Sequence, residues 1–187
     1  MFNIILYFLL VGNITAILIE SDTFKMVEEA SGKKFDIFVE NTETTFSIKV
    51  KEKNLTYTEI FNVVNDTFYL EERIIKMGIF NIKISYEPKR IRMILPISEN
   101  TEWEYKGIES GIGYRKSIES RGYIELHSDT LYIFNISRRG SKEDTSMIAF
   151  DKDYNLYRIS IQIPGIMNLY KLFGFKSNTI LLRRDTF

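Results

Sequence analysis

The sequence predicts a mostly β protein: an antiparallel meander that forms a sandwich or a partly open barrel, with one or two short helices. Two observations support this fold class. The 187 residues include three alanines, while Ile, Phe, Tyr, Thr and Asn are abundant, so strand-favouring residues outnumber helix-favouring ones. Short segments of alternating apolar and polar residues also recur at a spacing of roughly 8–12 residues between turn formers, which is typical of antiparallel sheets.

The composition excludes several classes of chemistry. The 25 basic side chains balance 25 acidic ones, so the excess of positive charge that is typical of nucleic-acid binders is missing. The chain has no Cys and one His, which excludes disulfides, thiol nucleophiles, structural zinc sites built on cysteine and His-rich metal centres. We therefore expect no cofactor, no metal and no nucleic-acid partner.

The N-terminal segment has the composition of a targeting sequence rather than of a part of the folded domain. Residues 2–19 contain no charged side chain, and a run of this length is typical of a segment that enters a membrane or a translocon. We expect residues 1–19 to be a signal peptide, with Ala16 before the cleavage site, or an uncleaved signal anchor that contacts the membrane. A buried core segment is the third alternative. The first two predict a secreted, periplasmic or anchored protein.

The rest of the chain divides into a short connecting segment and one domain. Residues 20–34 predict a short helix or a linker, because Asp22 can cap a helix, Phe24 and Val27 lie about one turn apart, and Gly32 can end it. Residues 35–187 predict a single β-rich domain, since no interdomain linker or low-complexity tract interrupts them.

From Phe35 onward the apolar residues recur with a period of two. Turns are expected at 65–66, near Gly78, at 88–90, at 127–130 and at 151–155. The strands expected between these and other turns are 46–50, 57–64, 67–71, 79–86, 91–95, 102–106, 114–119, 122–127, 131–137, 146–150, 156–163 and 179–182. The alternation predicts that the core includes Phe46, Ile48, Val50, Ile82, Ile84, Trp103, Ile159 and Ile161.

Two apparent motifs have ordinary structural explanations. His127 precedes Ser128 and Asp129, but neighbouring residues in a turn point in different directions and cannot form a catalytic triad. The glycine-rich run 107–117 has the spacing of neither a P-loop nor a dinucleotide fingerprint. We interpret the first as an exposed turn and the second as a turn or bulge between strands.

Two groups of carboxylates have equally plain explanations. Glu102 and Glu104 flank Trp103 on one strand face, where surface charge is far commoner than an acid/base pair. The run 151–155 begins like a calcium loop but lacks the loop Gly and the distal Glu. No catalytic or metal-binding residue is therefore predicted.

Two segments resemble known families. Residues 95–107, LPISENTEWEYKG, resemble the signature L-P-[LI]-x-x-G-x-x-W-x-Y-x-G of uncharacterised exported bacterial β-proteins, with Asn100 at the position of the turn glycine. Residues 150–156 are similar to the strand–turn–strand repeats of lipoprotein-carrier (LolA/LppX-like) half-barrels. The resemblance implies an extracytoplasmic setting and an apolar cavity, and it implies no catalytic residue.

These observations predict a non-enzymatic, extracytoplasmic β-rich domain with a binding or envelope-structural role. The alternative is a carrier that holds a lipid or another hydrophobic ligand in a half-barrel cavity; the partner would then be that ligand rather than an envelope protein. The candidate ligand-binding residues are Trp103, Tyr105, Leu169 and Phe173. The last two belong to an apolar stretch, 166–175, which we expect to pack over one end of the sheet without leaving a large open cavity.

Overall fold

The computed structural model of the chain describes residues 19–95, 101–127, 130–137, 146–151, 153–163, 169–172 and 174–185. Over these ranges the chain forms strands and one four-residue helix. The elements are β1 (Asp22–Glu28), β2 (Lys34–Asn41), β3 (Thr45–Glu52), β4 (Leu55–Val64), β5 (Thr67–Met77), β6 (Phe80–Ile94), β7 (Glu102–Gly111), β8 (Tyr114–His127), β9 (Thr130–Ser137), β10 (Ser146–Asp151), β11 (Leu156–Gln162), α2 (Leu169–Leu172) and β12 (Thr179–Arg184).

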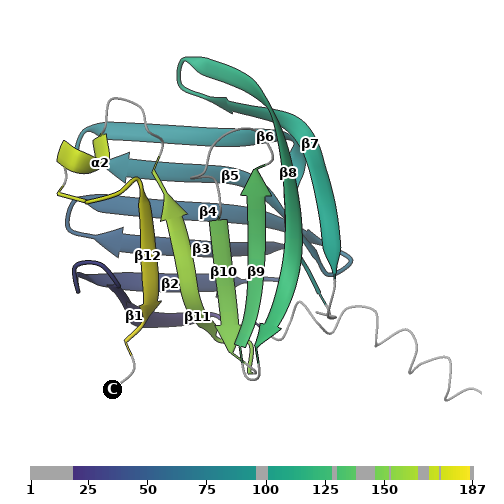
Figure 1. The fold of residues 1–187 in the computed structure, drawn as a ribbon, viewed down its shortest axis with the longest axis horizontal. Helices are drawn as coiled ribbons and strands as arrows, with labels where there is room; N and C mark the ends of the chain where they lie inside the picture. Colours follow the sequence, from purple (N-terminus) through teal and green to yellow (C-terminus); the bar gives the residue numbers. More distant parts are fainter. Residues whose placement is uncertain are drawn as a thin grey trace, which may run out of the picture.

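The strands form one antiparallel sheet that closes on itself. Each strand pairs with its neighbour in the sequence, and β1 also pairs with β12 through residues 26–28. Figure 1 shows a flattened barrel in which β1 to β6 form one layer and β7 to β12 form a second layer that crosses it steeply. The structure therefore confirms the mostly β class and the antiparallel meander, and it favours the barrel over the sandwich.

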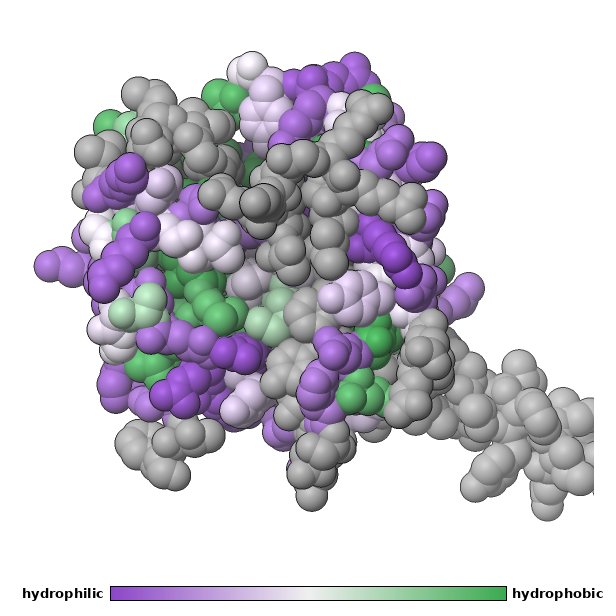
Figure 2. Space-filling model, viewed as in Figure 1, coloured by the Kyte–Doolittle hydropathy of each residue, from purple (hydrophilic) through white to green (hydrophobic). Residues whose placement is uncertain are grey.

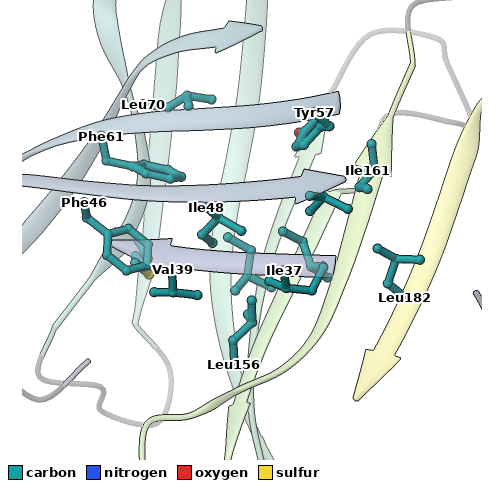
Figure 3. Packing of buried hydrophobic residues seen from close by; sticks show 14 of the residues in the cluster. Ile37, Val39, Phe46, Ile48, Tyr57, Phe61, Leu70, Leu156, Ile161 and Leu182 are labelled. Atoms are coloured by element: carbon teal, nitrogen blue, oxygen red, sulfur yellow. The ribbon is translucent and has the colours of Figure 1, made fainter. Parts of the chain in front are cut away.

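The core lies between the two layers. All eight residues that the alternation predicts to be buried are so, with exposed fractions of 7% or less. Figure 3 shows side chains of β2, β3 and β4 pointing toward those of β11 and β12. On the face drawn in Figure 2, the described residues are mostly hydrophilic, with smaller hydrophobic groups between them. The period of two thus separates an apolar interior from a polar outer surface.

Two turns form as their residue types predict. Asn65 and Asp66 have φ of 47° and 59°, which suits a two-residue hairpin turn between β4 and β5, because such turns match the twist of the strands. At 151–155, Asp151 Oδ1 accepts hydrogen bonds from the backbone N–H groups of Asp153 and Asn155, both at 2.9 Å. This carboxylate is therefore used by its own turn.

The helix expected between Asp22 and Gly32 is wrong, because this segment forms β1. The strand gains hydrogen-bonded neighbours on both sides, and Met26 and Glu28 are buried. These long-range contacts outweigh a weak local helical pattern. Residues 20–34 consequently supply a strand of the barrel and the turn that leads to β2, rather than a helix or linker outside it.

Two expected interruptions are absent, and a third, the turn in the glycine-rich run, is shorter than expected. β6 continues through residues 88–90, where we expected a turn, and register shifts in its pairing with β5 absorb the irregularity. β8 runs unbroken from 114 to 127 instead of forming two strands. Within the glycine-rich run, residues 107–111 extend β7 and the turn falls at 112–113. A long strand can bend at such points without losing its partners.

Several expectations concern residues outside the described ranges. The N-terminal segment falls there up to residue 18, so its signal or anchor function stays a prediction. The backbone of Leu169 belongs to α2, but its side chain and the whole of Phe173 also lie outside the description. In the parts of the chain that are described, no helix has the length and apolar character needed to cross a membrane.

Candidate functional site

A polar cluster interrupts the apolar interior of the barrel. Every second residue of β4, from Leu55 to Val63, faces the core, and Glu59 occupies one of these inward positions. Arg73 on β5 lies directly across from it in the ladder. Tyr57 and Arg92 complete the cluster, and all four side chains are buried.

Glu59 is the hydrogen-bond acceptor at the centre of this cluster. Its Oε1 accepts hydrogen bonds from the Tyr57 hydroxyl at 2.6 Å and from Nε and Nη2 of Arg73 at 3.1 and 2.7 Å. Nε of Arg92 lies 3.8 Å from Glu59 Oε2. One carboxylate therefore faces two guanidinium groups in a region shielded from water.

The surroundings keep Glu59 ionised. Burial alone would raise the pKa of this carboxyl, but the positive charges of Arg73 and Arg92 and the two hydrogen-bond donors hold it below its ordinary value. Burial also raises the pKa of Tyr57, so its hydroxyl keeps the proton that it donates to Glu59. The arrangement is therefore a buried, hydrogen-bonded ion pair.

Two further polar residues of β6 face the same interior. Tyr86 and Arg90 lie four positions apart, and the Arg90 Cζ is 5.9 Å from the centroid of the Tyr86 ring. Among the described residues, the Tyr86 hydroxyl and Nε of Arg90 are buried and have no hydrogen-bond partner. Burial raises the pKa of Tyr86 despite the nearby positive charges of Arg73 and Arg90. The hydroxyl is therefore protonated and can donate.

This cluster borders a weakly paired junction between β6 and β7, which we call the β6–β7 seam. The two strands pair only through residues 85–87 and 108–110 over the described chain. Beyond Pro88, side chains replace the ladder: the Tyr105 hydroxyl donates to Pro88 O at 2.7 Å, and Trp103 Nε1 donates to Ile91 O at 3.2 Å. Burial raises the pKa of Tyr105 to about 12, so this donor remains protonated at neutral pH.

The candidate residues from the sequence are thus partly located. Trp103 and Tyr105 lie together at the seam, 7% and 5% exposed, and each uses its polar atom to hold the β6 backbone. The structure does not describe the side chains of Leu169 and Phe173, so a shared site with the aromatic pair stays a prediction.

Gly122 allows the Trp103 indole to lie flat across β8. The two residues are ladder partners, and a Cβ at position 122 would collide with the indole ring. We expect Gly122→Ala to lower the free energy of unfolding by about 1–3 kcal/mol, because the ring must leave its position. Denaturant unfolding measures this loss, and the fluorescence of the single tryptophan should shift with it. An unchanged stability and spectrum would contradict the packing of indole on glycine.

A cleft lies at the end of the barrel that carries the β2–β3 and β4–β5 hairpins. It has a volume of about 880 Å³. Its walls are residues 19–21, 41–44 and 63–66. Asn41 fixes the first of these segments, because its Nδ2 donates to Ile19 O at 2.7 Å and its backbone N–H donates to Ser21 Oγ at 2.9 Å. We call this feature the end cleft.

The acidic residues considered from the sequence behave as surface charge. Glu102 and Glu104 are exposed, and Glu102 forms an ion pair with Arg121. His127 is exposed, with Nε2 3.5 Å from Glu125 Oε1. Over the described residues, no group of three or more His, Cys, Asp or Glu side chains is placed to hold a metal ion.

Sequence reasoning missed the buried charges, although the pattern contains a signal for them. Glu59 occupies the same alternate, inward-facing positions of β4 as Tyr57 and Phe61. Arg90 and Arg92 occupy those of Tyr86 in β6. A charged residue in an inward-facing register is costly unless it is paired, so it marks a site with a specific role.

Comparisons of the chain with protein-family models, curated proteins and solved structures find no match.

Proposed function

We propose that the protein is a non-enzymatic binding protein that holds a small hydrophobic ligand at the end of its barrel. The end cleft is the observation that carries this proposal. Its volume of about 880 Å³ lies within the range of roughly 300–1,000 Å³ that is usual for small-molecule sites. N-terminal export, expected from residues 1–19, would place the protein outside the cytoplasm.

The lining of the cleft indicates the class of ligand. Ile19, Val63 and Val64 supply apolar surface, and Val64 is 48% exposed. Glu20, Glu43 and Asp66 lie around it, so the cleft has an acidic lining. Negative charge disfavours an anionic ligand, so the cleft suits a neutral or cationic apolar molecule.

A second cleft, of about 590 Å³, supports binding less well. It lies on the outer surface of β3 to β5 and is lined mainly by threonines and by Lys49, Lys51 and Lys76. Flexible lysines on a wet sheet face are ordinary solvated charge. The end cleft combines a larger volume with buried apolar residues, and we therefore assign the ligand to it.

Nile red, a neutral hydrophobic dye, tests this proposal. We expect the dye to bind the wild-type protein and to bind Val64→Trp at least about tenfold more weakly, because the indole fills the cleft. Ile112→Trp is the matched control, since Ile112 is an exposed apolar residue in the β7–β8 turn, away from the cleft. Fluorescence titration measures both affinities.

Equal dye affinity in the two variants, or no binding to the wild-type protein, would contradict a ligand in the end cleft. The second result would favour the envelope-structural role, which requires no small-molecule site. Circular dichroism and thermal unfolding establish that both variants remain folded. Because Val64 is already half-exposed, its replacement should leave the core intact.

A further inference from the structure

One buried arginine near the β6–β7 seam has no carboxylate partner among the described residues. Glu59 pairs with Arg73, whereas the buried guanidinium of Arg90 forms no ion pair with a described carboxylate. Buried charges are usually paired, because an uncompensated charge loses its hydration without recovering the energy. The cluster therefore favours an additional negative charge.

The nearby carboxylates are already paired elsewhere. Glu87 is exposed and lies 3.6 Å from Nη2 of Arg115. Glu109 Oε1 accepts a hydrogen bond from the Tyr114 hydroxyl at 3.1 Å and lies 3.2 Å from Nζ of Lys116. Among the described residues, neither of them forms an ion pair with Arg90.

Arg90 and Tyr86 pack against each other, and each has a buried donor. They lie on the same face of β6, at 6% and 5% exposure, with the guanidinium over the phenol ring. Both have a buried donor atom without a partner in the described part of the chain. Such orphaned donors are rare in native proteins, and two of them on side chains that lie against each other indicate a missing acceptor.

We propose that Arg90 and Tyr86 form a binding site for a carboxylate or another small oxyanion beside the β6–β7 seam. The guanidinium supplies the charge and the directed N–H donors, and the phenol supplies an O–H donor to the same ligand. Arg73, whose Nε and Nη2 donate to Glu59, adds positive charge nearby without direct contact.

The seam supplies the route to this site. β6 and β7 separate beyond Pro88, and the Tyr105 and Trp103 rings close the space between them. In the described part of the two strands no ladder hydrogen bonds join them there, so side chains close this route. The end cleft has an acidic lining and is built from other residues, so the anion site does not depend on the proposed function.

Calorimetric titration with decanoate, decanol and acetate, at constant ionic strength, tests the anion site. We expect decanoate to bind at least about tenfold more tightly than decanol, which has the same tail without the charge. Acetate binding would identify a site for free small oxyanions, and binding of decanoate alone would identify the head group of an amphiphile. Both results support the oxyanion site.

Two tyrosine variants make the test specific. Tyr86→Phe removes the orphaned hydroxyl, so it should weaken decanoate binding roughly tenfold to a hundredfold, the effect of one hydrogen bond to a charged group. Without ligand it should unfold at the same or a higher temperature, because no partner is lost. Tyr105→Phe removes a hydroxyl that donates to Pro88 O, so, unlike Tyr86→Phe, it should lower the unfolding temperature.

Arg90→Met provides the charge test. This variant should lose decanoate binding and should keep the affinity for Nile red at the end cleft. Unchanged decanoate affinity in both Tyr86→Phe and Arg90→Met, or no preference of the wild-type protein for decanoate over decanol, would overturn the anion site. Neither result would alter the dye titration that tests the end cleft.

Discussion

Glu59→Gln is expected to lower the free energy of unfolding by about 3–5 kcal/mol, the usual cost of removing one partner from a buried ion pair. Glutamine keeps the shape and one acceptor oxygen, but it leaves Arg73 and Arg92 facing a neutral group in a dehydrated interior. Urea unfolding followed by circular dichroism measures the change. Glu72→Gln is the control, because its partner Lys83 is 59% exposed and surface pairs contribute about 0–1 kcal/mol.

The pH dependence of stability provides a second measure of the same ion pair. The pKa of Glu59 is lowered in the folded protein, so its contribution is complete above the ordinary glutamate pKa of 4.5 and is lost as pH falls through the lowered value. Wild-type stability should therefore decline in this acid range, and Glu59→Gln should lack that part of the decline. Equal acid sensitivity of the two proteins would show that Glu59 is not held ionised by the arginines.

Phe61→Ala should also cost about 3–5 kcal/mol of unfolding free energy, as for other buried aromatic residues. Phe61 is fully buried, and its ring centroid lies 5.5 Å from that of Phe46, which in turn packs edge-on against Phe68 at 5.3 Å. These rings come from β3, β4 and β5, so the truncation opens a void shared by adjacent strands. Figure 3 shows the Phe46 and Phe61 rings within the core.

Phe80→Ala is the matched control for this truncation. Phe80 lies at the start of β6 and is 37% exposed, so the same chemical change removes less buried surface. Its loss should therefore be much smaller than that of Phe61→Ala in the same urea titration. A similar loss for both phenylalanines would contradict the assignment of Phe61 to the core.

The sequence predicts the fold well where one strand face is buried and the other is wet. Phe46, Ile48 and Val50 occupy alternate positions of β3 and are all buried. The residue types of Asn65 and Asp66 likewise predict the turn between β4 and β5. It fails where tertiary pairing overrides local preference. Residues 22–28 become a strand because β2 and β12 flank them, and residues 88–90 remain in β6 because β5 continues to pair around them.

The candidate site is harder to predict because its elements are far apart in the sequence. The sequence predicts Trp103 as a core and candidate ligand-binding residue, but its role depends on Gly122 and on the backbone of Ile91, which only the folded barrel brings to it. The alternation of each strand alone shows that the arginines and Glu59 occupy inward-facing positions. Their pairing across β4, β5 and β6 requires the ladder register, which alternation does not specify.

Closure of the ring by β1 and β12 has a consequence for synthesis and folding. The first strand receives its second partner only from the last one, so a growing chain carries an open β1 edge until residues 182–184 have emerged and can pair with it. Such distant pairing slows folding, and open edges pair readily with other chains. A C-terminal truncation that removes β12 would leave β11 and β1 each without one of its neighbours, so the closed ring of described strands would become a sheet with two open edges.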